Sequence, residues 1–369
     1  MRISWGTVIA VMEERPGLQR LEVACDELAG ACKAVCYPPL TGPVAAGDRV
    51  LLNTTAVDLR LGTGGAHFVT AVEHVGRPRT GDMFDDDSGG HVMKLRYTPV
   101  QRDVLAVEEP ASPHHAVMAQ AMSLQGMPVI CCGLHSQVPL AAAAAKFARP
   151  DARIAYIMTD QASLPIAMSD VVSKSLVTGL IDTTFTCGQA YGGQFEAVTL
   201  HSALLAARHV AHADLAIVSV GPGVVGTATP FGHAGVAQGE AVNAASVVGG
   251  APVACLRLSF RDVRERHIGV SHHTLTALGS IALAPATVAI PVLPPLEAAA
   301  VEEALESAGV FVLHERAYVE FDLAEAVASV GFEVRTMGRG PLEDPAFFAA
   351  AAAAGYVGSL SGYHPESSD

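Results

Sequence analysis

The stretch that decides the fold is MPVICCGLHSQVPLAAAAAKFA, residues 127–148. Its first part is a short apolar run that predicts a buried strand over Pro128–Gly133. Its alanine-rich second part predicts a helix over Pro139–Ala148. A continuous apolar strand followed by a helix is the repeating unit of parallel sheets, because helices cover both faces of such sheets.

The same alternation continues toward the C-terminus. Further strands are predicted at Arg153–Met158, Thr183–Cys187, Asp214–Val220, Pro252–Ser259, Val310–His314 and Phe332–Met337. Further helices are predicted at Ser169–Gly179, Ser202–Ala211, Val236–Val248, Leu296–Ala308, Leu323–Val330 and Glu343–Ala354. We therefore expect an α/β domain over residues 127–360, with a mainly parallel, Rossmann-like sheet as the middle of three layers.

Residues 1–108 have a different pattern. Short segments rich in β-forming residues are separated there by turn-forming residues such as Pro16-Gly17 and Gly47-Asp48. The predicted strands are Thr7–Met12, Arg20–Cys25, Lys33–Tyr37, Arg49–Asn53 and His91–Thr98. We expect a small β-barrel or β-sandwich over residues 1–108, a linker over 109–126 and a flexible tail over 361–369.

Composition excludes several classes of partner. The formal net charge is −14 and aromatic residues make up 5% of the 369 residues, a balance that argues against nucleic acid as a partner. The longest apolar stretch, Ile281–Leu293, is interrupted by two prolines and is shorter than the roughly 18–20 residues of a membrane span. The N-terminus has no apolar core of the secretory type, and the seven cysteines are odd in number and irregularly spaced. These features favour a cytoplasmic protein with reduced thiols.

Polar residues gather where five of the predicted strands end. In open parallel sheets, ligands bind at the carboxyl ends of the strands, where the following loops meet. The loops that leave the strands here are rich in glycine, histidine, hydroxyl and charged residues, whereas the loops that enter them contain fewer such residues. The polar loops are 131–137, 159–161, 187–193, 221–229 and 257–262. This asymmetry predicts a small-ligand site at the exit edge of the sheet.

The loop Gly221–Gly226 matches the pattern G-x-G-x-x-G of dinucleotide-binding folds. Its context differs from that motif, because Pro230 delays the next helix and Arg257 follows the next strand where a ribose-binding acid would stand. A looser interpretation is that the glycines admit an anionic ligand and that threonine hydroxyls contact it. A glycine-rich turn needed only for packing is an equally good interpretation.

Four residues are candidate acids or bases: His135, Asp160, His272 and His273. The candidate ligand-binding residues are Ser136, Gln137, Gly192, Gly193, Gly221, Gly223, Gly226, Thr227, Thr229, Arg257 and Arg261. No zinc-binding signature is present, and the adjacent His272 and His273 diverge on any regular element, so we predict no metal site. A metal held by His135, Asp160 and one of these histidines is the alternative. The sequence indicates no particular cofactor.

Five separated blocks resemble a known family. They are Glu14–Gln19, Leu51–Val57, Met93–Pro99, Gly221–Thr227 and Gly269–Leu278. Taken in order, they are similar to the bacterial domain-of-unknown-function family 3866 over nearly the full length of the chain. The resemblance implies one intact cytoplasmic protein of bacteria, and it implies no activity and no catalytic residues.

The leading hypothesis is a small-molecule enzyme, a hydrolase or transferase that binds an anionic or nucleotide-like ligand at the exit edge. The alternative is a non-catalytic ligand-binding or regulatory protein, which would account for the lack of a complete catalytic signature. A structural or assembly protein is a third interpretation. Alanine-rich helices are also compatible with a homo-oligomer.

Overall fold

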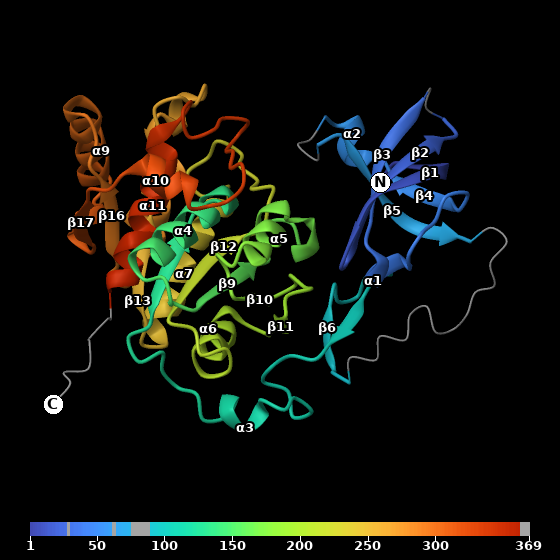
Figure 1. Cartoon of the computed structure of the whole chain (residues 1–369), viewed down its shortest axis with the longest axis horizontal. Coiled ribbons are helices and arrows are strands. Elements are labelled where there is room, and N and C mark those ends of the chain that lie inside the picture. The colour runs from blue at the N-terminus through green and yellow to red at the C-terminus, as the bar shows by residue number, and fades with distance from the viewer. Residues whose placement is uncertain (28–29, 61–63, 75–88, 362–369) are drawn as a thin grey trace. The chain divides into compact units, whose positions relative to one another are not determined.

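A computed structural model describes residues 1–27, 30–60, 64–74 and 89–361 (Figure 1). The chain divides into two compact units, Met1–Val104 and Leu105–Asp369. Residues 109–126, for which the sequence suggests a linker, lie within the second unit: Leu124 packs in its core, and the Leu124 amide donates to the Val248 carbonyl oxygen. The suggested tail lies outside the described residues from residue 362 onward.

The first unit is a closed barrel with the strand order β1-β2-β3-β5-β4. The strands are β1 (Ile3–Arg15), β2 (Leu18–Cys25), β3 (Ala31–Cys36), β4 (Arg49–Asn53) and β5 (Ala66–Glu73). Neighbours are antiparallel except for β3 and β5, which are parallel. Val23, Val50 and Leu52 fill the interior and are fully buried. The β-rich domain expected from the sequence is therefore a barrel.

Smaller elements complete this unit. They are the short helices α1 (Pro38–Thr41) and α2 (Thr55–Asp58) and a hairpin of β6 (Val92–Lys94) and β7 (Arg102–Val104). The sequence analysis did not predict β5 or β7.

Two cysteines of the barrel differ from the expectation of reduced thiols. Cys25 and Cys32 form a disulfide, whereas the other five cysteines are free and buried. The bonded cysteines lie on neighbouring strands, only seven residues apart in sequence. Strand pairing therefore brings them together, which an odd total of cysteines does not exclude.

The second unit contains an eight-stranded, all-parallel sheet with the order β11-β10-β9-β12-β8-β13-β16-β17 (Figure 1). The strands are β8 (Pro128–Cys132), β9 (Ile154–Thr159), β10 (Thr183–Thr186), β11 (Phe195–Glu196), β12 (Leu215–Val220), β13 (Ala251–Cys255), β16 (Thr287–Pro291) and β17 (Glu315–Val319). The predicted parallel α/β sheet is confirmed.

Helices cover both faces of this sheet. On one face lie α4 (Val138–Ala148), α5 (Asp170–Val177), α10 (Leu323–Ala328) and α11 (Pro345–Leu360). On the other lie α6 (Leu200–His209), α7 (Ala237–Val247) and α9 (Pro295–Ser307), together with the short helix α3 (His115–Met118). Successive residues of β8 alternate between the two cores: Val129 and Cys131 belong to one, Ile130 and Cys132 to the other. The predicted three layers are therefore confirmed.

Two predicted strands are wrong. Val310–Val312 forms a turn of 3-10 helix after Gly309, and the strand β17 begins only at Glu315. Phe332–Met337 forms no strand, although the buried Val334 gives the segment its apolar character. The sheet instead gains β16, which lies inside the apolar stretch 281–293.

The segment predicted as one strand at Pro252–Ser259 is split. The sheet strand β13 ends at Cys255, and Leu258–Ser259 (β14) pairs with Gly269–Val270 (β15) in a separate two-stranded sheet.

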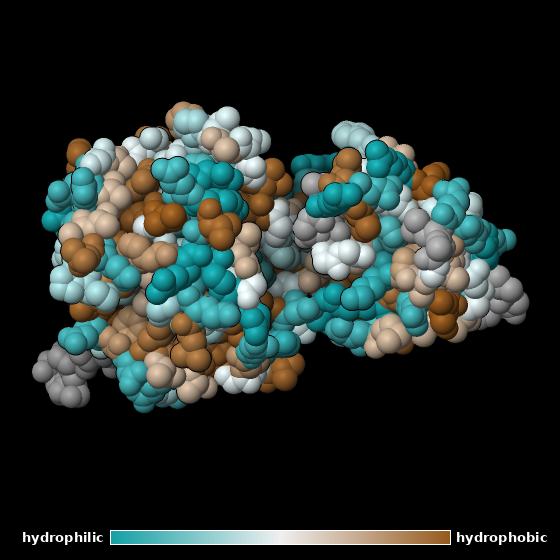
Figure 2. All heavy atoms as spheres, turned by 90° about the horizontal axis from the view of Figure 1, so that it is seen from above, coloured by the Kyte–Doolittle hydropathy of each residue, from teal (hydrophilic) through white to brown (hydrophobic). Residues whose placement is uncertain are grey.

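Among the described residues, no helix has the length and apolar character needed to cross a bilayer. Hydrophilic and hydrophobic residues are interspersed over the face drawn in Figure 2.

The packing of α4 against α11 depends on a glycine. A Cβ atom on Gly355 of α11 would overlap the Ala141 carbonyl oxygen of α4 and lie 2.8 Å from its carbonyl carbon. The contacted atoms are backbone, so the two helices would have to separate. We expect Gly355→Ala to lower the free energy of unfolding by about 1–3 kcal/mol, despite the better helix propensity of alanine.

Denaturant unfolding followed by circular dichroism measures this loss. Gly340→Ala is the matched control, because a Cβ there has its nearest neighbour, the Glu343 carboxylate, at 3.7 Å. Equal stability of Gly355→Ala and wild type would show that α4 and α11 do not need this close approach.

Candidate functional site

The exit edge of the sheet contains a topological switch point between β8 and β12. These strands are neighbours, yet the helices that follow them, α4 and α7, lie on opposite faces of the sheet. The loops after β8 and β12 therefore lead to opposite faces of the sheet. In open parallel sheets, ligands bind at the position where two such loops separate. The loop after β13, on the other side of β8, borders the same position.

Two glutamines tie these strand ends together. The Gln137 side chain is fully buried, donates to the Leu256 carbonyl oxygen (2.8 Å) and accepts from the Leu134 amide (2.9 Å). Gln238 donates to the carbonyl oxygens of Cys131 (2.8 Å) and Cys255 (2.6 Å). Because both ends of its amide bond to backbone, Gln137 holds the strand ends in place and does not present its side chain to a ligand.

His135 is enclosed by its own network. The Tyr156 hydroxyl lies 3.1 Å from Nδ1 and the Ser169 hydroxyl 2.6 Å from Nε2. Burial lowers the pKa of His135 to about 4, so the ring is neutral at neutral pH. Ser169 also caps α5 by accepting from the Val172 amide. The geometry gives His135 a structural role.

Three other predicted residues belong to the side of the sheet formed by β9, β10 and β11. The Asp160 carboxylate accepts from the Gln189 amide at 2.9 Å. The Gly192 amide donates to Glu196, and a Cβ on Gly193 would approach backbone atoms of Thr186 and Phe195 within 3 Å. These glycines allow the tight turn from β10 to β11. Outside this group, the Ser136 hydroxyl lies 3.1 Å from that of Thr336.

The conformation of the loop after β12 is fixed by glycines and by a bridge within the loop. A Cβ on Gly221 would lie 2.5 Å from the Ser163 carbonyl oxygen, and Gly223 has a φ of +93°, so both positions require glycine. Further along, a bridge pairs Gly226 with His233.

The threonine hydroxyls of this loop bond to the loop itself. The Thr227 and Thr229 hydroxyls lie 2.9 Å apart, and Thr227 donates to the Gly232 carbonyl oxygen at 2.9 Å. Both residues are exposed. The main effect of the loop is to place His233 beside the residues that follow β13.

Four imidazoles from two loops form one cluster, here called the imidazole cluster: His233, His267, His272 and His273. The His233 and His273 rings are stacked, with centroids 3.9 Å apart and planes within 7°. The His272 centroid lies 4.5 Å from that of His273, and the His267 centroid 5.1 Å from that of His272. The structure thus brings the predicted His272 and His273 together with two further histidines.

A serine holds two of these rings in position. Ser271 caps the short helix α8 (His272–Thr276) by accepting from the His273 amide. Its hydroxyl also lies 2.7 Å from Nδ1 of His267. Ser271 is fully buried.

Arg257 fixes the tautomer of His273. The buried guanidinium lies 2.9 Å from Nδ1 of His273 and can only donate, so the proton of the neutral ring is on Nε2. Burial, together with the charge of Arg264, lowers the pKa of Arg257 to about 10, and it stays cationic at neutral pH. The cluster therefore contains one buried positive charge.

Burial keeps the four imidazoles neutral. It is the main reason that their pKa values lie below the ordinary value of 6.5, and neighbouring histidines and Arg257 add to the effect. The pKa of His273 falls to about 2 and that of His267 to about 3. Among the described residues, Nδ1 of His233 and Nε2 of His272 are buried and have no hydrogen-bond partner. Such atoms are uncommon in folded proteins, and these two remain available for a hydrogen bond.

Acidic groups near the cluster are already paired. Asp262 accepts two hydrogen bonds from the Arg264 guanidinium, which hold the pKa of that carboxyl well below its usual range. Asp344 accepts from Ser259 (2.7 Å) and Arg339 (3.0 Å). Arg261, predicted to bind ligand, is exposed, and its backbone amide donates to Ser259.

The arrangement suits an anion better than a metal ion. Ligand atoms of His233, His272 and His273 lie within 4.8 Å of one another, which is close enough for a shared metal. However, the lone pairs of the stacked His233 and His273 rings lie in nearly parallel planes and do not converge, and Nδ1 of His273 already accepts from Arg257. The guanidinium and the Nε2–H group of His273 are instead donors that an anion requires.

A further cleft lies at the same edge of the sheet, beyond the ends of β16 and β17. Its volume is about 420 Å³. Its lining is largely apolar, and Glu297 and Glu320 also border it. This cleft follows two strands whose exit loops the sequence analysis did not consider.

A family model, described as a protein of unknown function (DUF3866), matches residues 33–355. The chain belongs to the DUF3866 family. Four of the five sequence blocks that suggested this family lie inside the match, and Glu14–Gln19 precedes it. No curated protein and no solved structure matches the chain.

The imidazole cluster lies within the DUF3866 match, yet sequence reasoning identified only half of it. His267 and His233 are not among the site residues predicted from the sequence. His233 could have been predicted as a site residue, because it lies in the exit loop of β12. Its stacking on His273, 40 residues away, depends on strand order.

The neutral imidazoles predict a pH-dependent stability. Unfolding returns the pKa of His273 from about 2 to about 6.5, so the unfolded chain binds a proton that the folded chain does not. Stability is therefore lost as the pH falls below about 6.5. For His273 alone, we expect a loss of about 2 kcal/mol between about pH 8 and pH 5.

Denaturant unfolding across this pH range measures the loss. His273→Asn keeps an acceptor for Arg257 and should flatten the profile by about that amount. His201→Asn, at an exposed position of α6, is the control and should leave the profile unchanged. Identical pH profiles for wild type and His273→Asn would contradict a lowered pKa of His273 in the folded chain.

Proposed function

We propose that this protein is a small-molecule enzyme, a hydrolase or transferase, that binds an anionic or nucleotide-like ligand at the exit edge of the parallel sheet. The observation that carries the proposal is the pair of unpartnered, buried imidazole nitrogens, on His233 and His272, in a cluster that contains the buried Arg257. Nε2 of His233 donates to the Pro230 carbonyl oxygen, so the unpartnered Nδ1 of the neutral ring carries a lone pair. An anion that bonds there does so with uptake of a proton by the imidazole, and the bond would remove the cost of leaving the nitrogen unpaired.

Local charge supports an anionic ligand. The chain as a whole is acidic, with a formal net charge of −14, yet the charges of Arg264, Arg266 and Arg339 all act on Arg257. The carboxylates of Asp262 and Asp344 are bonded to Arg264 and Arg339 and offset only part of this field. A phosphate or carboxylate beside Arg257 would gain charge-assisted hydrogen bonds in a site largely shielded from water.

The proposed acid–base group is His272. Its side chain is half-buried, whereas those of the other three cluster histidines are buried, so it is the most accessible to a ligand. An anion bound at Arg257 would raise the lowered pKa of His272 toward neutrality, because a negative charge stabilises the imidazolium form. An imidazole that titrates near neutral pH transfers protons efficiently.

A non-catalytic ligand-binding protein is the second candidate. The hydroxyl within reach of a cluster imidazole, that of Ser271, is fully buried and caps α8, so it is not exposed as a nucleophile. His135, the other predicted base, is bonded on both ring nitrogens. Binding without turnover would favour this candidate.

Anion binding tests the proposal directly. The probes are phosphate, pyrophosphate and ATP, measured by isothermal titration calorimetry at about pH 6.5 and about pH 8, on either side of the range in which the imidazoles respond. We expect at least one probe to bind, with greater affinity at the lower pH, because binding is coupled to proton uptake by the imidazole cluster. Arg257→Gln should weaken binding about 10-fold to 100-fold through loss of a charged hydrogen bond.

The variants separate binding from catalysis. Arg208→Gln is the control, because that arginine lies on α6 and contacts Gln125. His272→Gln should retain binding and lose turnover of any probe that is hydrolysed. Unchanged affinity in Arg257→Gln would refute the anion site, and binding without turnover in the wild type would identify a ligand-binding protein.

The cellular setting is part of the proposal. We propose the bacterial cytoplasm: five of the seven cysteines are free and buried, which accords with a reducing compartment, whereas the Cys25–Cys32 disulfide does not. A small molecule is the proposed partner, with no role for nucleic acid or a membrane. We retain a homo-oligomer as part of the proposal, since α9 exposes Leu296 at 88%, and light scattering coupled to size-exclusion chromatography tests it.

A further inference from the structure

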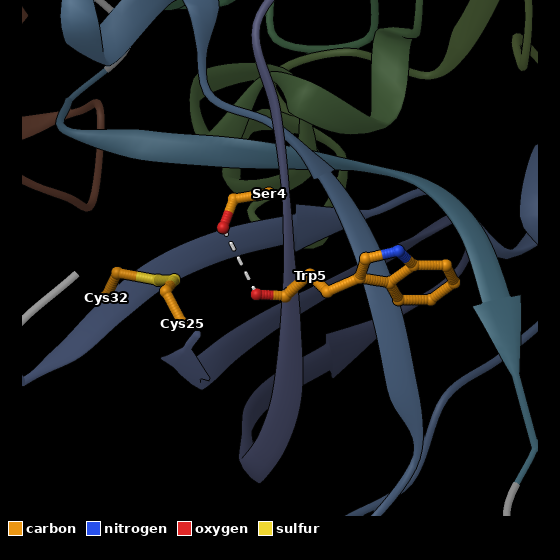
Figure 3. Close-up of a disulfide and its surroundings, with 4 residues drawn as sticks. All are labelled: Ser4, Trp5, Cys25 and Cys32. Carbon is orange, nitrogen blue, oxygen red and sulfur yellow. Dashed lines mark hydrogen bonds between the residues drawn. A yellow bond between two sulfur atoms is a disulfide. The ribbon is translucent and has the colours of Figure 1, made fainter. Parts of the chain in front are cut away.

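The barrel contains a second group of side chains with metal-binding chemistry. Cys25 ends β2 and Cys32 lies on the neighbouring β3, and the two are joined by a disulfide (Figure 3). Their Cα atoms are 6.7 Å apart. Cys25 belongs to the barrel core, and Cys32 packs against it. Both sulfur atoms therefore lie at the inner side of the barrel wall.

His67 on β5 faces the same place. β5 pairs with β3 so that His67 stands opposite Ala34, two residues from Cys32 and on the same side of the strand. The side chain is only 2% exposed, and among the described residues its Nδ1 atom has no hydrogen-bond partner. Ligand atoms of Cys25, Cys32 and His67 all lie within 4.8 Å of one another.

We propose that Cys25, Cys32 and His67 form a binding site for a thiophilic divalent ion such as Zn²⁺ when the disulfide is reduced. Two thiolates and one imidazole are the ligand types that Zn²⁺ prefers, and they leave one position of a tetrahedral site for water or another ligand. The disulfide form and the metal-bound form are then alternative states of one site.

The orphaned nitrogen of His67 distinguishes this site from a purely structural disulfide. A buried polar atom without a partner costs about 1–3 kcal/mol. The disulfide gives Nδ1 nothing to bond, since neither sulfur carries a proton. A metal ion bound by the reduced sulfurs would use the Nδ1 lone pair.

The two states interconvert by thiol–disulfide exchange with a dithiol. The first sulfur of the dithiol attacks one sulfur of the Cys25–Cys32 bond and releases the other cysteine as a thiolate. The second sulfur then attacks the first, which closes the disulfide of the dithiol and releases the remaining cysteine thiolate. Two electrons pass to the cysteines, and the dithiol becomes a disulfide. Metal binding then releases the protons of the two thiols, because only thiolates are ligands.

Cobalt titration of the full-length chain tests the site. The protein is reduced with dithiothreitol, freed of the reductant without air, and titrated with Co²⁺, whose bonds to thiolate sulfur give a charge-transfer band in the near ultraviolet. We expect one such Co²⁺ ion per reduced chain, its displacement by Zn²⁺, and no band in the oxidised chain.

Three variants identify the ligands. Cys32→Ser should abolish the charge-transfer band, and His67→Asn should keep the thiolates but weaken Co²⁺ binding at least 10-fold. Cys36→Ala is the control, because Cys36 is a free, fully buried thiol of the same barrel. Circular dichroism establishes that each variant is folded.

Absence of the band in the reduced wild type would overturn the proposal, as would an unchanged Co²⁺ affinity in His67→Asn. A metal ion bound at the imidazole cluster would give no sulfur band, so it is not mistaken for this site. The proposal does not rest on the proposed function, and its failure leaves the anion site untouched.

Discussion

An all-parallel sheet must be covered on both faces, and the rest of the larger unit depends on this constraint. In β8 every residue is buried, and successive side chains enter opposite cores. The chain meets the constraint by placing α4 on one face and α7 on the other, so the loops after β8 and β12 separate at one edge of the sheet. The position of the imidazole cluster follows from this topology, since its residues come from the loops after the two strands that flank β8.

How far the sequence predicts the fold depends on burial. The central strands β8, β9 and β12 are fully or almost fully buried, so their apolar runs predict them within one or two residues. The edge strand β17 is mostly exposed, and its sequence ERAYV has no apolar run. The sequence therefore predicts a strand over Val310–His314, just before β17, where Val310 is buried. Apolar character reports burial, and at the edge of a sheet burial and strand structure no longer coincide.

The candidate site was predictable in location and only partly in composition. The rule for the exit edge identified the loops that hold Arg257, His272 and His273. It also selected Gln137 and His135, whose polar side chains hold loops and strands together, because a polar residue in an exit loop serves either purpose. The stacking of His233 on His273 and the Cys25–Cys32 bond depend on the order and pairing of strands, which neither spacing nor composition specifies.

Neutral imidazoles are a consequence of packing, and they are also what would let the cluster respond to the proposed anion. Burial, together with the stacked His233 ring and the Arg257 guanidinium, disfavours protonation of His273, so Arg257 is the charged group of this cluster and the imidazoles are neutral. An anion bound beside Arg257 would favour protonation of the imidazoles, because each proton taken up would then face a negative charge. The unpartnered nitrogens of His233 and His272 are thus a cost to the free protein that the proposed anion would offset, and its binding would then raise the stability of this unit.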